Sequence, residues 1–241
     1  MKLHWLALGI TMVSLGVLGC GGGNSAATSS NGSGSDGEQV EDVGGSEIKR
    51  RSLDSLPAVG AYLPPQDGGR IHLAPPEGWR PVSRDKYLAR FVKGEPSELP
   101  RITIIAADSP SPEVTTLTED NLSELIPLLT EQSKAGKKTP IEPVRPIILG
   151  DHVFARHVRI ARLNDEPCAI VSLQTVQDGR MYTVELYVKA GSDGSEYAKY
   201  LKQSQDSVYA VAANLKFGDD PAPTTSPELA EEKPAEESAS E

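Results

Sequence analysis

Four β-rich runs follow one another in the C-terminal half of the chain, separated only by short polar joints. The runs cover residues 147–149, 153–162, 167–177 and 180–190. The joints are Gly150-Asp151, Asn164-Asp165-Glu166 and Asp178-Gly179, and Asp-Gly between two apolar runs is a strong signal for a β-hairpin. Because tight turns join antiparallel neighbours, the pattern predicts an antiparallel strand meander.

The last of these runs alternates strictly between apolar and mostly polar residues. Tyr182, Val184, Leu186 and Val188 fall on one side of the strand, and Thr183, Glu185, Tyr187 and Lys189 on the other. Such alternation is typical of an antiparallel sheet with one covered face. We expect the tyrosine and valine side to be buried.

Two helices are predicted, one before and one after the meander. In the first, Thr116 with Glu119 and Asn121 with Glu124 have capping-box spacing, and the apolar stripe is Leu122, Leu125, Ile126 and Leu129. Pro127 lies inside this stripe and is expected to kink the helix or delay its start. A Lys- and Pro-rich loop is expected from residue 134 to residue 146.

The second helix is expected to begin at Asp193 and Glu196 and to end near Leu215. Its apolar stripe is Tyr197, Leu201, Val208, Val211 and Leu215. Earlier β-rich runs cover residues 70–74, 86–93 and 101–107. The order of elements predicts an α+β fold, with an antiparallel sheet of about six or seven strands packed against two helices.

Both ends of the chain lack the apolar residues that a core needs. Residues 21–55 are mostly Gly, Ser, Asn, Asp and Glu, and residues 218–241 are mostly Pro, Ala, Ser, Thr and Glu. We expect a disordered tether over 20–55, a single domain over 56–217, and a disordered acidic tail over 218–241. The domain holds 19 Lys and Arg against 20 Asp and Glu, so it has no basic footprint for nucleic acid.

The first twenty residues have the form of an export signal. Lys2 precedes an apolar run from Trp5 to Leu18, which ends in Gly19-Cys20. This ending resembles the lipobox of bacterial lipoproteins. The resemblance implies that residues 1–19 are a cleaved signal peptide and that Cys20 carries acyl chains. It places the protein in the cell envelope, held to a bacterial membrane by the lipid on Cys20 and facing the periplasm or the exterior.

The motifs of common enzymes and cofactor proteins are incomplete in this chain. Gly32-x-Gly34-x-x-Gly37 has dinucleotide spacing but no preceding strand. Ser83-x-x-Lys86 lacks the partner motifs of serine acylases. Gly136-Lys137-Lys138-Thr139 lacks the upstream glycine of a P-loop. We therefore expect no enzyme activity and no cofactor.

Several single residues are candidates for a functional site. Cys168 is the one cysteine besides Cys20, and its apolar neighbours favour a buried, inert thiol. His152 and His157 are five residues apart and face opposite sides of a strand, so we expect no metal site. Trp79 and Tyr87 either line a groove or cap the core, and we favour the cap. The remaining candidates are arginines that form either an anion-binding face, with Arg162 brought towards Arg180, or a solvated face: Arg156, Arg159, Arg162 and Arg180.

The entry to the domain, Ile71-x-Leu73-x-x-Pro76-x-Gly78-Trp79, together with the order of elements over about residues 60–217, resembles the PsbP-like fold. That superfamily includes photosystem assembly factors, small binding modules and bacterial lipoproteins. It shares no catalytic residues, so the resemblance implies a fold and no site.

These observations favour a membrane-tethered, non-enzymatic accessory or protein-interaction module with an extracytoplasmic protein partner. The alternative is a carrier of a small ligand, with a pocket between the sheet and the helices.

Overall fold

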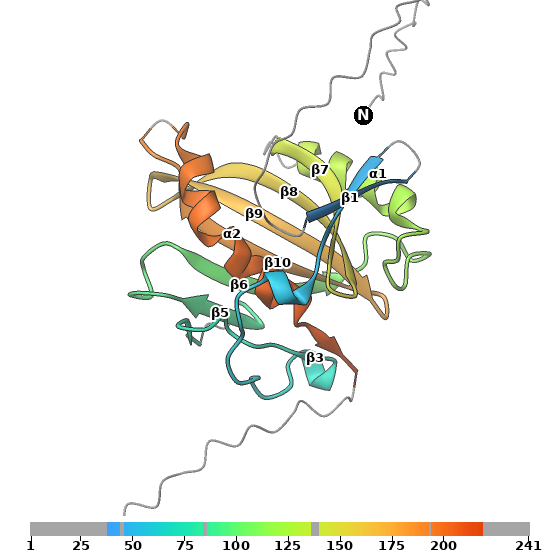
Figure 1. Cartoon of the computed structure of the whole chain (residues 1–241), viewed down its shortest axis with the longest axis horizontal. Coiled ribbons are helices and arrows are strands. Elements are labelled where there is room, and N and C mark those ends of the chain that lie inside the picture. The colour runs from blue at the N-terminus through green and yellow to red at the C-terminus, as the bar shows by residue number, and fades with distance from the viewer. Residues whose placement is uncertain (1–37, 44–45, 84–85, 136–139, 193, 219–241) are drawn as a thin grey trace, which may run out of the picture. The chain divides into compact units, whose positions relative to one another are not determined.

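A nine-stranded sheet dominates the computed structural model, which describes residues 38–43, 46–83, 86–135, 140–192 and 194–218, with only the backbone given for 38–47 and 133–135. The strands lie in the order β1-β2-β7-β8-β9-β10-β6-β5-β4 (Figure 1). Their bounds are β1 Glu38–Val43, β2 Ser46–Arg51, β4 Arg80–Pro81, β5 Ala89–Val92, β6 Arg101–Asp108, β7 Pro140–Leu149, β8 His152–Leu163, β9 Glu166–Gln177 and β10 Arg180–Lys189. The α+β class is therefore confirmed, with more strands than the six or seven expected.

The predicted meander forms the centre of the sheet. β7, β8, β9 and β10 pair antiparallel in chain order, and β10 also pairs with β6. Asn164 and Asp165 join β8 to β9 with φ of 51° and 66°, and Asp178 and Gly179 join β9 to β10 with φ of 51° and 72°. Positive φ at both central residues is the hairpin turn that the Asx and Gly residues favour, so the joints are confirmed.

The sheet extends into the stretch that sequence analysis assigned to the tether. Lys49, Arg50 and Arg51 of β2 pair in parallel with Ile147, Ile148 and Leu149 of β7. Ile48 of β2 is 3% exposed and lies in a core cluster. The disordered tether predicted to run to residue 55 was wrong for this part. The burial of Ile48 and the pairing with the edge of β7 stabilise this strand. The average composition of residues 21–55 gives no sign of it.

The expected loop over residues 134–146 was wrong in its second half, because β7 already begins at Pro140. Its first residues pair irregularly with β8, with register shifts between Pro140 and Glu142 and between Glu142 and Arg145. Prolines at 140, 143 and 146 suggested a loop. Proline is tolerated at a sheet edge and at bulges, which is where these three lie.

The two helices, α1 (Leu122–Ala135) and α2 (Tyr197–Ala213), cover opposite faces of the sheet. The larger core packs α2 against Tyr182, Val184, Leu186 and Val188 of β10, as the alternation predicted. The smaller core packs α1 against β7, β8 and β9. Thr183 and Glu185 on the second face are also buried, so the sheet is covered on both sides and not on one alone.

The helix α1 starts at Leu122 and contains Pro127 within it. Asn121 shapes the turn before the helix: its Oδ1 accepts from the Thr118 N–H at 2.8 Å and its Nδ2 donates to the Thr116 carbonyl at 2.8 Å. These bonds replace the predicted capping boxes. In α2 the N-cap is Glu196, without a side-chain cap bond, and Leu201, Val208 and Val211 of the predicted stripe are buried.

The segment that joins β2 to β4 is fastened to the main sheet by a second small sheet and by Trp79. β3 (Ile71–His72) pairs with β11 (Lys216–Phe217), which follows α2. Two short 3₁₀ turns precede β3, at Leu53–Ser55 and at Asp67–Gly69. Trp79 is 8% exposed and part of the larger core, so the prediction that it caps the core is confirmed.

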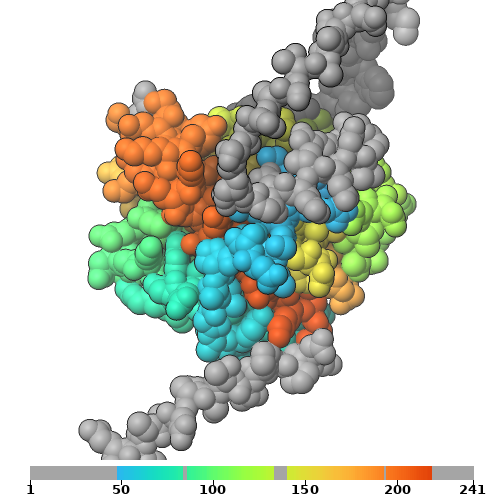
Figure 2. All heavy atoms as spheres, viewed as in Figure 1, coloured from blue at the N-terminus to red at the C-terminus, as the bar shows by residue number. Residues whose placement is uncertain are grey.

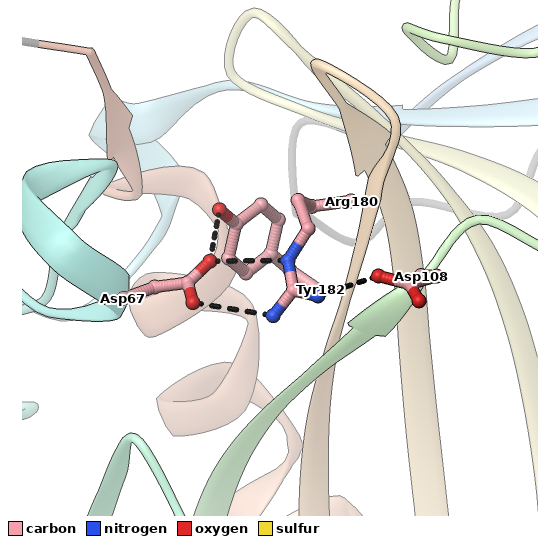
Figure 3. A network of polar contacts seen from close by, with 4 residues as sticks. All are labelled: Asp67, Asp108, Arg180 and Tyr182. Atoms are coloured by element: carbon pink, nitrogen blue, oxygen red, sulfur yellow. Dashed lines mark hydrogen bonds and ion pairs between the residues drawn. The ribbon is translucent and has the colours of Figure 1, made fainter.

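A polar network holds the turn at Asp67 against the start of β10 (Figure 3). Arg180 donates from Nε and Nη2 to the Asp67 carboxylate at 3.3 and 3.2 Å, and the Tyr182 hydroxyl donates to Asp67 Oδ2 at 2.9 Å. Arg180 Nη1 also donates to Asp108 Oδ1 at 2.7 Å. Burial acts to raise the pKa of Asp67, but the bonds from Tyr182 and Arg180 outweigh it and hold that pKa below its usual range. Burial and the bond to Asp67 raise the pKa of Tyr182 to about 12.

Candidate functional site

A groove of about 440 Å³ lies between α2 and the strands β2 and β7. We call it the α2 groove. Figure 2 shows the side of the molecule on which α2 (orange) and the segment near residue 50 (blue) come to the surface together. The groove is lined by Lys49, Arg51, Ile141, Glu142, Pro143, Arg145, Pro146, Ile147, Arg156, Leu201, Gln205 and Tyr209.

The charge of this lining is strongly unbalanced. It contains four cationic side chains and one carboxylate, that of Glu142. Arg156 Nη1 donates to Glu142 Oε2 at 2.6 Å, and Arg51 Nη1 donates to Asp206 Oδ1 at 2.8 Å just outside the lining. Arg156 and Arg51 thus each have a carboxylate partner.

Arg145 does not take part in either of these two ion pairs. Its side chain is exposed, and the described part of the chain gives it no hydrogen bond or ion pair. It lies on the wall of the groove, two residues before Ile147 on its floor. An anion that enters the groove therefore meets Arg145 without first having to break an existing ion pair.

The sequence of β7 explains why the groove stays open. Since β2 pairs with Ile147, Ile148 and Leu149, no strand among the described residues pairs with the outer side of the first part of β7. Prolines 140, 143 and 146 each lack a backbone N–H, so this part of β7 has three fewer donors. Proline at an edge also discourages another chain from adding a strand. The edge therefore presents side chains and carbonyl groups instead of a full ladder.

The floor of the groove combines an arginine with an aromatic ring. Arg156 is mostly buried, with 14% of its side chain exposed, and its guanidinium lies within reach of Gln205 Oε1 at 3.5 Å. Arg51 stands over the Tyr209 ring at 5.7 Å from the centroid. Burial raises the pKa of Tyr209, against the opposite effect of Arg156, so the phenol stays protonated and can donate a hydrogen bond. The floor thus offers donors to an anion.

The four candidate arginines do not form one face. Arg156 lies in the α2 groove, and Arg159 on the opposite face pairs with Glu185 at 3.0 Å, as their spacing on the strand predicted. Arg162 is exposed at the β8–β9 turn and donates to the Asp165 carbonyl, whereas Arg180 follows the β9–β10 turn. The expected approach of Arg162 to Arg180 was wrong, because the two turns lie at opposite ends of β9.

The histidines and Cys168 are dispersed as expected. His152 Nε2 lies 2.7 Å from the Leu215 carbonyl on the α2 side, and His157 lines a pocket on the α1 side. Over the described ranges there is no group of three or more residues suited to hold a metal ion. Cys168 is 1% exposed, and burial raises the pKa of its thiol, which makes it a poor nucleophile.

Several predictions concern parts of the chain outside the described residues. These are the signal peptide at 1–19, lipidation of Cys20, the first part of the tether, Gly32 to Gly37, Gly136 to Thr139 and the tail from residue 219. Residues 84 and 85 of the Ser83 to Lys86 motif also fall there. None of the helices that are described is both long enough and apolar enough to cross a membrane.

Comparison with known proteins gives matches among solved structures. No family model and no curated protein matches this chain. A Bacteroides thetaiotaomicron crystal structure is 13% identical with a TM-score of 0.42, over 66% of this chain and 48% of that protein. The solution structure of the cyanobacterial PsbP protein CyanoP, from Synechocystis sp. PCC 6803, is 12% identical with a TM-score of 0.40, over 67% of this chain and 95% of that one. This chain thus spans about half of the Bacteroides protein. At this level of similarity neither structure indicates a function for this chain.

Most of the groove was missed by sequence reasoning. Arg156 alone was considered as a candidate, while Lys49 and Arg51 stood in the presumed tether and Arg145 in a presumed loop. Only the fold brings these side chains together with Tyr209 of α2. The local signal available was the regular spacing of the prolines at 140, 143 and 146 next to Arg145, which marks an exposed edge.

Proposed function

We propose that this protein is a non-enzymatic interaction module, tethered by lipid on Cys20 to the extracytoplasmic side of a bacterial membrane. In this proposal its partner is a protein that places an acidic, extended segment in the α2 groove. The observation that carries the proposal is the exposed guanidinium of Arg145 in the lining of an open groove that also has apolar walls.

The lining supports a segment of mixed character. Charged groups across an interface set specificity and orientation, and here Lys49, Arg145 and Arg156 supply the positive side. Ile141 is 42% exposed, unusually open for a large apolar side chain, and Leu201 lies deeper in the lining. A segment in which glutamates or aspartates alternate with apolar residues complements both kinds of wall.

The tether rests on the sequence alone. The run from Trp5 to Leu18 followed by Gly19-Cys20 is the basis for lipidation. Each buried methylene of an acyl chain adds about 0.8 kcal/mol of membrane affinity, so several chains give a lasting anchor. Cys20→Ala is expected to release the protein from the membrane or to leave it uncleaved, and normal membrane fractionation of that variant contradicts the anchor.

Site-specific photo-crosslinking in cells of the source bacterium tests the interaction. A photoreactive amino acid at position 141 reports on the groove, and the same group at position 162, exposed at the β8–β9 turn, is the matched control. We expect a protein adduct from position 141 only, lost when Arg145→Glu is added. Equal adducts from both positions, or an adduct that survives Arg145→Glu, contradict docking in the groove.

A further inference from the structure

The face of the sheet opposite α2 carries a row of buried polar side chains. In register across five strands stand His157 on β8, Ser172 on β9, Glu185 on β10, Thr103 on β6 and Arg90 on β5. All five are 8% exposed or less. The neighbouring row holds Arg159, Tyr187 and Arg101.

Glu185 is the centre of the bonds in these rows. Its Oε1 accepts from Arg159 Nη2 at 3.0 Å and from Ser172 Oγ at 3.2 Å. Its Oε2 accepts from the Tyr187 hydroxyl at 2.7 Å. Both carboxylate oxygens of Glu185 thus accept hydrogen bonds from side chains of this face.

Other polar atoms on this face are buried without a partner. The described residues provide no hydrogen bond to His157 Nδ1, Thr103 Oγ1 or Arg101 Nε. Burying polar groups in this way costs free energy, and such groups in native proteins call for an explanation such as a bound molecule. Of these three residues, His157 also lines a pocket on this face.

A pocket of about 310 Å³ opens onto this row beneath the C-terminal half of α1. We call it the α1 pocket. Its polar lining is His157, Arg159, Ser172, Gln174, Thr183, Glu185 and Gln132, and its apolar wall is Ile105, Leu129 and Met181. The volume falls at the lower end of the range of small-molecule sites.

Arg159 has donors to spare in this pocket. Within the described parts of the chain it meets a carboxylate only through Nη2, so Nη1 and Nε retain their hydrogens for a second acceptor. Each of these donors can give a charge-assisted hydrogen bond to one oxygen of a ligand carboxylate. Arg101, stacked over the Tyr187 ring at 4.6 Å, lies in the neighbouring row of the same face, outside the lining of the pocket.

We propose that the α1 pocket binds a small carboxylate, whose charged group pairs with Arg159 and whose short hydrocarbon end lies against the apolar wall. This site is separate from the α2 groove, since the two lie on opposite faces of the sheet. It gives the protein a small-ligand function besides the docking of a partner.

Titration of sodium butyrate into the full-length protein tests the site, with the imidazole NMR signals of His157 as the readout. His157→Gln assigns the signal. Butyramide, which has the same shape and no charge, is the matched control ligand. We expect a saturable shift with butyrate at millimolar concentrations and no comparable shift with butyramide. Equal shifts with both, or no saturation by about 50 mM, overturn the proposal.

Arg159→Gln is expected to weaken butyrate binding by about tenfold or more, since a charge-assisted pair is lost. Arg162→Gln, on the same strand but exposed, is the control and is expected to bind as the parent does. If Arg159→Gln fails to fold because Glu185 is left unpaired, Thr183→Val and Met181→Glu test the same pocket. Unchanged binding in Arg159→Gln, or in Met181→Glu, contradicts the site.

Discussion

Asp67→Asn tests the network that holds the turn before β3 to the start of β10. The exchange keeps the shape of the side chain and removes its charge. Asp67 has a φ of 51°, and asparagine is among the residues that tolerate positive φ, so no backbone strain is introduced. The carboxylate is only 15% exposed and accepts two bonds from Arg180 and one from Tyr182.

Hydrogen bonds to charged groups contribute about 1.5–3 kcal/mol each at most, and the asparagine oxygen keeps part of them. We therefore expect Asp67→Asn to lower the free energy of unfolding by about 2 kcal/mol. For a typical dependence on urea, the midpoint of unfolding then falls by about 1 M. Asp108→Asn is the matched control: it binds the same Arg180 at 2.7 Å but is 92% exposed, and exposed pairs contribute about 0–1 kcal/mol. Equal losses in the two variants refute the reasoning.

The same variant has a defined pH dependence. Because the folded-state pKa of Asp67 lies below its ordinary value, its charge stabilises the fold above the unfolded-state pKa, near 4. The difference between parent and Asp67→Asn is therefore expected to be constant from pH 5 to 8 and to shrink as the pH falls below about 4. A difference that persists unchanged at pH 2 contradicts this.

Three further outcomes are expected. Leu125 is 0% exposed in the smaller core, and Leu125→Ala is expected to lower the free energy of unfolding by about 3 kcal/mol. Leu128 on the same helix is 40% exposed, and Leu128→Ala is expected to change that free energy by less than about 0.5 kcal/mol. Similar losses of stability for the two variants in urea denaturation contradict the packing of α1. In a Cys20→Ser background, Cys168 is expected to react with a thiol reagent at pH 8 at least about 100-fold more slowly in the native protein than in urea, and rapid native labelling contradicts its burial. Deletion of residues 219–241 is expected to leave Tm unchanged, and a fall of several degrees shows that the tail packs on the domain.

The central fold was predictable because its signals are local. The alternation in residues 180–190 and the Asp-Gly joint encode a strand, its buried face and its turn within a few residues. Strand β2 was not predictable in this way. Its parallel pairing with β7 joins residues almost a hundred positions apart, and a stretch with one isoleucine gives no local sign of it.

The candidate sites depend on the same long-range pairing. The α2 groove combines side chains from β2, β7, β8 and α2, and the polar row combines five strands. In the sequence of its own strand, each of Glu185 and Arg159 stands at a polar position of the alternation, which predicts an exposed side chain. Only the covering of the second sheet face turns these polar positions into buried ones.

The most direct test of the proposed function is fluorescence anisotropy of a labelled peptide of alternating glutamate and leucine, titrated with the full-length protein. We predict saturable binding that weakens with added salt and by about tenfold or more in Arg145→Glu, since reversing a charge beside the ligand changes the binding free energy by about 1.4 kcal/mol or more. Arg162→Glu is predicted to bind as the parent does. Equal affinities of the parent and Arg145→Glu contradict the α2 groove as the docking site for an acidic partner.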